Sequence, residues 1–232
     1  MSFEGKRIVV IIPAFNEEQS ISKVVNAIPN IIDEIIVINN GSDDSTAIKA
    51  SVSGAKVINE NRKGYGYACL KGIDYLHKNP PDIVVFLDGD YSDYPEDLGA
   101  VIKPILEKNV QFVVGARVKL LREKGALTPQ QIFGNALACL LMRLLYNANF
   151  TDLGPFRAIT WKNLLALEMS DKTYGWTVEM QLKVLDKKIP YKEIKVNYRK
   201  RIGVSKVSGT LKGTIFAGIK IIGWIFKHYI FK

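Results

Sequence analysis

Short apolar runs alternate with amphipathic segments over the first half of the chain. The runs at residues 7–13, 34–38 and 83–87 are continuous, which is typical of strands buried on both faces of a sheet. Shorter runs at residues 57–58 and 110–115 predict two more strands, with helical segments between them. Strands that alternate with helices predict an α/β fold, with a mostly parallel sheet flanked by helices.

The second half of the chain has a different pattern. Residues 116–129 predict a loop of mixed charge, and residues 131–145 predict a long apolar helix. A further helix is expected from about residue 174 to residue 185, followed by a strand at residues 189–198. The apolar segment at residues 211–231 is interrupted by lysines and predicts an amphipathic C-terminal helix.

Polar turns follow three of the predicted strands. Residues 13–17, 39–44 and 88–93 each come directly after an apolar run, so the turns should gather at one edge of a parallel sheet. Asp88 and Asp90 are hard oxygen donors that suit Mg²⁺ or Mn²⁺. An Asp-x-Asp sequence alone is equally consistent with a solvated acidic turn. The convergence of three polar turns favours the metal site.

The net charge of +9 belongs to the end of the chain. Residues 183–232 hold 13 Lys/Arg and 2 Asp/Glu, whereas residues 1–182 hold 19 and 21. This asymmetry indicates an anionic partner such as phosphate groups or a lipid surface. No nucleic-acid motif accompanies the charge, so nucleic acid is not expected as a partner. Two cysteines in apolar segments, and a start that leads straight into a strand without a signal peptide, predict a cytoplasmic protein.

Three motifs in order resemble a known family. Residues 13–17 (Pro-Ala-Phe-Asn-Glu), residues 39–42 (Asn-Asn-Gly-Ser) and residues 88–90 (Asp-Gly-Asp) are similar to those of the family 2 glycosyltransferases of the GT-A fold. Residues 152–157 and 201–206 resemble the branch that contains the dolichyl-phosphate mannose and glucose synthases. The resemblance covers residues 7–210.

The resemblance implies a division of the chain. Residues 1–210 would form the glycosyltransferase domain, with a nucleotide-sugar-binding half at residues 1–115 and an acceptor half at residues 116–210. Residues 211–232 would form the C-terminal amphipathic helix.

The resemblance also implies site roles. The residues that would bind the nucleotide sugar are Pro13, Phe15, Glu17, Asn39, Asn40, Asp88, Gly89 and Asp90. Asp90 would be the principal metal ligand, with Asp88 beside it. The residues that would bind phosphate are Arg117, Arg201, Ser205 and Lys206. Asp90 and Arg117 would also stabilise charge during catalysis.

Two carboxylates are candidates for a base or for positioning the acceptor. Asp152 lies in the motif before a predicted strand, and Glu179 lies in a predicted helix. The alternatives are a turn-forming residue and a solvated helix residue.

One position departs from the family pattern. Many relatives have an aspartate pair where this chain has Asn39 and Asn40. An amide can still bond a base edge, because it offers both a donor and an acceptor, so base selectivity is more affected than catalysis. Asp43 and Asp44 would be either compensating carboxylates or residues at the start of a helix.

Together these observations predict a metal-dependent, inverting glycosyltransferase that moves a sugar from a nucleotide-diphosphate sugar to a polyprenyl phosphate. The alternatives are transfer to a soluble or glycan hydroxyl, and a catalytically weak nucleotide-sugar-binding subunit. The C-terminal helix carries Ile215, Phe216, Ile219, Ile222 and Phe226 at helical spacing, with Lys212, Lys220 and Lys227 beside them. It would lie peripherally on the inner face of a membrane, or pack on the catalytic domain or on a second subunit of a homo-oligomer.

Overall fold

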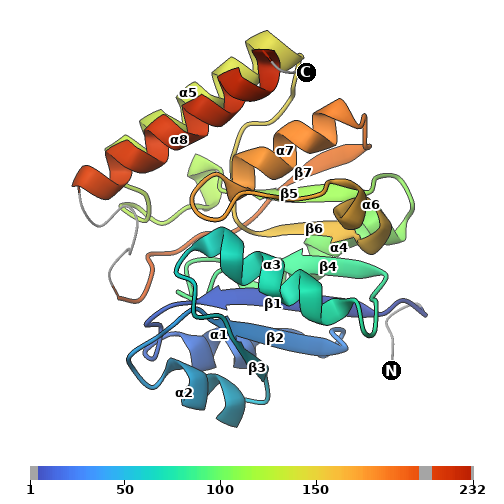
Figure 1. The fold of residues 1–232 in the computed structure, drawn as a ribbon, viewed down its shortest axis with the longest axis vertical. Helices are drawn as coiled ribbons and strands as arrows, with labels where there is room; N and C mark the ends of the chain where they lie inside the picture. The colour runs from blue at the N-terminus through green and yellow to red at the C-terminus, as the bar shows by residue number, and fades with distance from the viewer. Residues whose placement is uncertain (1–4, 204–210, 231–232) are drawn as a thin grey trace.

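A single seven-stranded sheet organises the molecule. The computed structural model describes residues 5–203 and 211–230, with side chains of the last segment from residue 216 onward. The sheet order is β3-β2-β1-β4-β6-β5-β7 (Figure 1). All neighbouring strands are parallel except β6, which is antiparallel to both β4 and β5. The strands are β1 (Ile8–Ala14), β2 (Glu34–Asn39), β3 (Lys56–Asn59), β4 (Ile83–Phe86), β5 (Phe112–Ala116), β6 (Arg157–Thr160) and β7 (Tyr191–Lys195).

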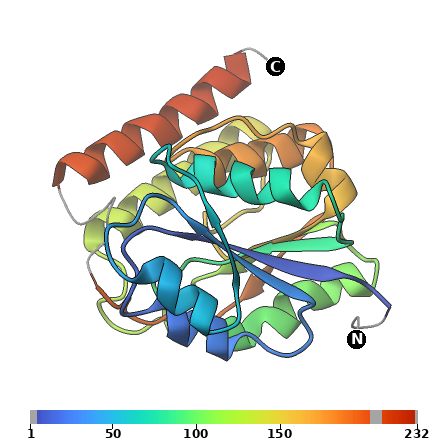
Figure 2. The ribbon, with the colours of Figure 1, turned by 60° about the horizontal axis from the view of Figure 1, so that its bottom comes forward.

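Helices cover both faces of this sheet (Figure 2). Side chains alternate across a strand, so β1 places Val9 and Ile11 in one apolar cluster and Ile8, Val10 and Ile12 in the other. The first cluster is shared with α3 (Tyr65–Leu76), α5 (Pro129–Tyr146), α6 (Trp161–Ala166), α7 (Trp176–Asp186) and α8 (Leu211–Ile230). The second is shared with α1 (Ile21–Ala27), α2 (Thr46–Val52) and α4 (Leu98–Leu106). The predicted α/β architecture is therefore confirmed.

Residues 16–18 (Asn-Glu-Glu) predict the start of the first helix, but that helix, α1, begins at Ile21. The backbone N–H groups of residues 16, 17 and 18 donate to Ser42 Oγ, Thr46 Oγ1 and Asp44 Oδ2 respectively. Asn16 also has a φ of 54°, in the left-handed region. These contacts with the turn after β2 hold residues 15–20 outside a helix. Asp44 additionally accepts from the N–H of Thr46 at the start of α2, as the helix-start alternative predicts.

Other boundaries differ by a few residues. The loop predicted at residues 116–129 contains a 3₁₀ turn at Lys119–Leu121, and a second 3₁₀ turn at Pro95–Asp97 precedes α4. α5 starts at Pro129 because Thr128 and Gln131 form a reciprocal capping box. The strand predicted at residues 189–198 is shorter, and α6 was not predicted. Cys69 and Cys139 are buried, and neither forms a disulfide.

The C-terminal helix packs on the body of the protein. α8 runs beside α5 in both views (Figures 1 and 2). The Tyr146 hydroxyl at the end of α5 donates to the carbonyl of Ile225 at 2.8 Å. Ile225 is fully buried. α8 therefore contributes to the core as well as to the surface.

A close approach between α3 and the loop before α7 requires a glycine. A Cβ atom on Gly66 would lie 2.1 Å from the Asp171 carbonyl oxygen, which is backbone and cannot turn aside. We expect Gly66→Ala to lower the free energy of unfolding by about 2 kcal/mol, measured by urea denaturation. Gly99→Ala in α4 is the matched control, since its nearest neighbour would be 3.9 Å away. It should be neutral or stabilise by about 0.5–1 kcal/mol, and equal effects of the two would contradict the close approach.

Candidate functional site

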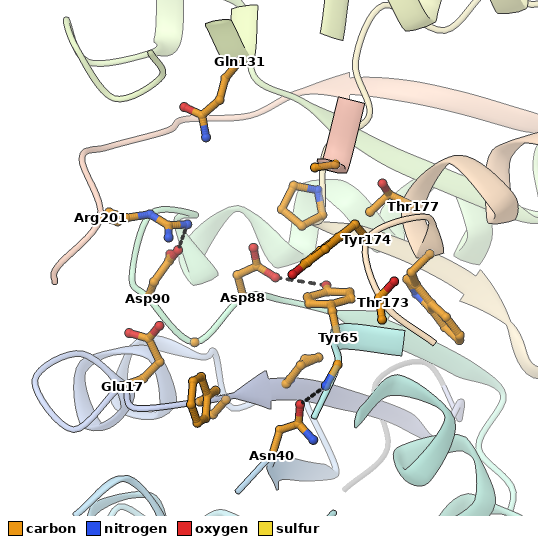
Figure 3. A pocket seen from close by; sticks show the side chains of 18 of the residues that line it. Glu17, Asn40, Tyr65, Asp88, Asp90, Gln131, Thr173, Tyr174, Thr177 and Arg201 are labelled. Carbon is orange, nitrogen blue, oxygen red and sulfur yellow. Dashed lines mark hydrogen bonds and ion pairs between the residues drawn. The ribbon is translucent and has the colours of Figure 1, made fainter. Parts of the chain in front are cut away.

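A cavity of about 530 Å³ opens at the carboxyl ends of the central strands. The turns after β1 and β4 form one part of its wall, as the strand-end pattern predicts (Figure 3). The predicted site residues that line it are Pro13, Phe15, Glu17, Asn40, Asp88, Gly89, Asp90, Arg117 and Arg201. Asn39, Asp152 and Glu179 do not line it. Ser205 and Lys206 lie outside the described residues.

Asp88 and Asp90 project from the end of β4 into this cavity (Figure 3). Asp88 accepts a hydrogen bond from the Tyr65 hydroxyl at 3.0 Å. Asp90 accepts from the N–H of Ser92 at 2.8 Å through one oxygen, and its other oxygen pairs with Arg201. Burial and then the charge of Asp90 raise the pKa of Asp88 to about 6, while Arg201 and Tyr65 oppose the rise. The two carboxylates therefore need a positive counter-charge.

A third carboxylate lies behind this pair. Asp93 is 1% exposed, and neither of its side-chain oxygens has a hydrogen-bond partner among the described residues. Burial, then the charges of Asp88 and Asp90, raise its pKa well above the usual range. The described part of the chain contains no group of three His, Cys, Asp or Glu side chains arranged to hold a metal ion.

The residues present fit a divalent cation with few protein ligands. Asp88 and Asp90 supply hard oxygens, and their mutual repulsion would be relieved by a cation between them. Mg²⁺ is commonly bound by one or two carboxylates together with substrate phosphates and water. In this structure the Arg201 guanidinium provides the counter-charge for Asp90.

Arg117 is held in place by Asp152. Its Nε and Nη2 donate to the two carboxylate oxygens at 2.8 and 2.6 Å, and its backbone N–H donates to Oδ2 at 2.7 Å. Burial alone would lower the pKa of Arg117, but Asp152 raises it well above the usual range. Arg117 lines the cavity and Asp152 does not. Asp152 therefore fixes the orientation of the Arg117 guanidinium from outside the cavity.

Glu179 supports a loop rather than facing the cavity. It is completely buried, not solvated, and it accepts from the N–H and hydroxyl of Ser170 and from the N–H of Asp171, at 2.6 to 2.8 Å. Lys183 pairs with it at 2.8 Å. The loop that it anchors carries Thr173 and Tyr174 into the cavity wall.

The two asparagines after β2 have different surroundings. The Asn40 amide donates to the carbonyls of Glu60 and Arg62 and accepts from the N–H of Gly64, so it ties the strand end to the loop before α3. The Asn39 amide instead donates to Asn59 at the next strand. Asn40 thus shapes the cavity wall, and Asn39 lies away from it.

Several cavity residues were not predicted from the sequence. They come mainly from the loop before α3, the loop before α7 and the two long helices: Lys63, Gly64, Tyr65, Gln131, Pro155, Thr173, Tyr174, Thr177, Tyr198, Ala217 and Ile221. By sequence alone, Gly64 and Gly66, which flank Tyr65, fit either a close backbone approach or an ordinary turn; in the structure a Cβ on either would collide with the backbone of residues 171–172. By residue type, Trp176 could be either a platform for a sugar or a core residue; it is 1% exposed and meets Phe86 edge-on, as a core residue does.

Comparison with known proteins identifies the family to which the chain belongs. The glycosyl transferase family 2 model matches residues 9–166. An uncharacterized glycosyltransferase of Mycobacterium tuberculosis (strain H37Rv) is 32% identical over 214 residues, which are 92% of this chain and 95% of that protein. The UDP-N-acetylglucosamine–dolichyl-phosphate N-acetylglucosaminyltransferase of Methanococcus voltae is 32% identical over 166 residues, or 63% of this chain and 66% of that protein.

Solved structures share the fold. Glucosyl-3-phosphoglycerate synthase from Mycobacterium tuberculosis, in complex with Mn²⁺, UDP and glucosyl-3-phosphoglycerate, superposes with a TM-score of 0.77. The two sequences are 23% identical, and the match covers 97% of this chain and 80% of that one. The fold is therefore of the GT-A type. The chain belongs to glycosyl transferase family 2 and is a glycosyltransferase.

The Arg117–Asp152 pair gives a test of the role of Asp152. Their side chains are 13% and 7% exposed, so Asp152→Asn would leave a buried guanidinium without its counter-charge. We expect the free energy of unfolding to fall by about 3 kcal/mol, measured by denaturant unfolding. Lys6→Met is the control, because the Lys6–Asp82 pair is 48% and 39% exposed and should be worth less than about 1 kcal/mol. An Asp152→Asn protein as stable as wild type would contradict this role of Asp152 as the buried partner of Arg117.

Proposed function

We propose that this protein is a metal-dependent, inverting glycosyltransferase that moves a sugar from a nucleotide-diphosphate sugar to a polyprenyl phosphate. The observation that carries the proposal is the Asp88–Asp90 pair beside Arg117 and Arg201 in one cavity at the strand ends. Two carboxylates and two guanidiniums suit a ligand that combines a metal ion with several phosphate groups.

The donor would lie along the turns after β1, β2 and β4. Pro13, Phe15 and Glu17 line the cavity next to the acidic pair and would hold the nucleoside, with Asn40 fixing the adjacent loop. Asp88 and Asp90 would hold Mg²⁺ or Mn²⁺, which neutralises charge on the leaving diphosphate. The similarity to the UDP-N-acetylglucosamine enzyme of Methanococcus voltae and to a phosphoglycerate synthase solved with bound UDP supports a uridine nucleotide as the donor.

The chain's own cations would act on the phosphates. Arg117 is oriented by Asp152, so its position costs no reorganisation when charge develops on the diphosphate. Arg201 would exchange its contact with Asp90 for a phosphate oxygen. Ser205 and Lys206, outside the described residues, would also bind phosphate.

An acceptor phosphate would leave Asp88 and Asp90 to the metal ion, because it needs no general base. A phosphate monoester is already a nucleophile at neutral pH and needs no proton removed. Attack on the face opposite the diphosphate would invert the sugar configuration. The dolichyl-phosphate enzyme of Methanococcus voltae supports a polyprenyl phosphate, and the phosphoglycerate synthase supports a soluble acceptor that also carries a phosphate. We favour the first, because two exposed helices offer a surface for lipid.

That surface is formed by α5 and α8. Neither helix contains an Asp or a Glu. Their large exposed apolar side chains are Ile132, Phe133, Leu140, Leu144, Phe216, Ile219, Phe226, Tyr229 and Ile230. Apolar side chains with exposed Arg143 and Lys227 nearby suit an anionic membrane surface. In the described part of the chain, no helix is both long and apolar enough to cross a bilayer.

A donor and acceptor panel tests the activity. Incubation with nucleotide sugars, Mn²⁺ and undecaprenyl phosphate should give a lipid-linked sugar, and chelation of the metal should abolish it. Asp90→Ala should reduce turnover by at least about a hundredfold without unfolding the protein, because the metal loses its principal ligand. Donor binding without transfer or hydrolysis would instead favour a nucleotide-sugar-binding subunit. Retained turnover in Asp90→Ala would refute the role of Asp90.

Liposome flotation tests the membrane surface. Wild-type protein should float with vesicles of phosphatidylglycerol and phosphatidylcholine and float less as the anionic lipid is diluted. The double change Leu144→Glu and Phe226→Glu places two charges on exposed positions, 71% and 43% exposed, and should abolish flotation. Ile48→Glu and Val52→Glu, exposed on α2, form the matched control and should leave flotation unchanged. Equal flotation of both double variants would rule out this surface.

A further inference from the structure

The cavity has two chemically different ends. Glu17, Asp90 and Arg201 lie together at one side of the close-up, and Thr173, Tyr174 and Thr177 lie at the other (Figure 3). These last three side chains are uncharged, and Pro155 and Trp176 also belong to the lining. The cavity therefore has a charged end, where a cation on the acidic pair would complement phosphate, and an uncharged end that has room for an apolar group.

The C-terminal helix completes this lining. Ala217 and Ile221 of α8 both line the cavity. They are four residues apart, so they lie on the same face of the helix. The sequence pattern assigned α8 to a membrane or to a protein contact, and it gave no indication that the helix borders the site.

One buried carboxylate holds α8 in this position. Asp171 is 4% exposed; it pairs with Lys220 Nζ at 2.8 Å and accepts from Trp224 Nε1 at 2.8 Å. Its other oxygen accepts from the N–H groups of Thr173 and Gly175, at 2.7 and 3.0 Å. A Cβ atom on Gly175 would lie 2.4 Å from the Trp224 ring, so the loop and the helix are in close contact. The same loop supplies Thr173 and Tyr174, and α8 is fixed to it.

We propose that Ala217 and Ile221 form the subsite for the apolar tail of the acceptor and select which tails are accepted. The inference rests on the proposed polyprenyl-phosphate activity. With the acceptor phosphate at the Arg117 and Arg201 end, the tail passes along Tyr174 and α8. Gln131 of α5 also lines the cavity, so both helices of the exposed apolar surface border this site. A tail that leaves the cavity between them would enter lipid directly.

Ala217→Phe tests the subsite by filling it. We expect kcat/KM for undecaprenyl phosphate to fall at least about tenfold, because a binding site that has lost room discriminates by this amount or more. Binding of UDP with Mn²⁺, measured by calorimetry, should be unchanged. Gly223→Trp is the matched control on the same helix, since no heavy atom lies within 4 Å of its added Cβ. It should leave both quantities unchanged.

Ile221→Ala provides a second variant that removes bulk and does not depend on Ala217→Phe folding. It should raise KM for undecaprenyl phosphate severalfold while leaving KM for the donor unchanged. If both variants transfer sugar to undecaprenyl phosphate as wild type does, the tail subsite is refuted and the proposed activity stands. If wild type glycosylates only a soluble phosphorylated acceptor, the proposed activity fails, and this inference fails with it. If donor binding and kcat/KM for undecaprenyl phosphate fell equally, α8 would only support the structure of the cavity, and the tail subsite would be refuted.

Discussion

The structure depends on how negative charge is tolerated at the end of β4. Asp88, Asp90 and Asp93 approach one another in a poorly solvated region, and the pKa values of Asp88 and Asp93 are raised. Repulsion of this kind destabilises a fold unless cations compensate it. Arg201 pairs directly with Asp90, and Arg117 faces the same cavity. Arg117 is held by Asp152, whereas Arg201 pairs with the acidic cluster itself. Such a cluster is suited to exchange its contacts with guanidiniums for contacts with a metal ion and phosphate.

The supporting parts of the site are also carboxylates, but with a different role. Asp152 fixes Arg117, Glu179 fixes the start of the 170–175 loop, and Asp171 ties that loop to α8. Each accepts several hydrogen bonds and is almost completely buried. Buried carboxylates of this kind position neighbouring groups. The distinction matters for mutagenesis, because loss of activity at these residues would accompany loss of structure.

Burial and hydrogen-bond partners distinguish the supporting carboxylates from those that face the cavity, whereas residue type alone does not. Asp152 and Glu179 were predicted beside Asp88 and Asp90 as groups for the chemistry, since residue type is the same in all four. Only the tertiary contacts show that Asp152 is saturated by Arg117 and that Glu179 faces Ser170. The start of α1 was misplaced for a similar reason, because the N–H groups of residues 16–18, before the helix, donate to residues 42–46, which are distant in sequence.

The sequence by itself determined the layered α/β fold and the edge at which the site lies. Continuous apolar runs require burial on both faces, and polar residues directly after them must emerge at the strand ends. These are local constraints, readable from residue order. Tertiary structure alone decided which polar groups meet, that β6 runs antiparallel within the sheet, and that α8 returns to border the cavity beside Tyr174. Such contacts join segments that lie far apart in the sequence, as between Asp171 and Lys220, and no local pattern encodes them.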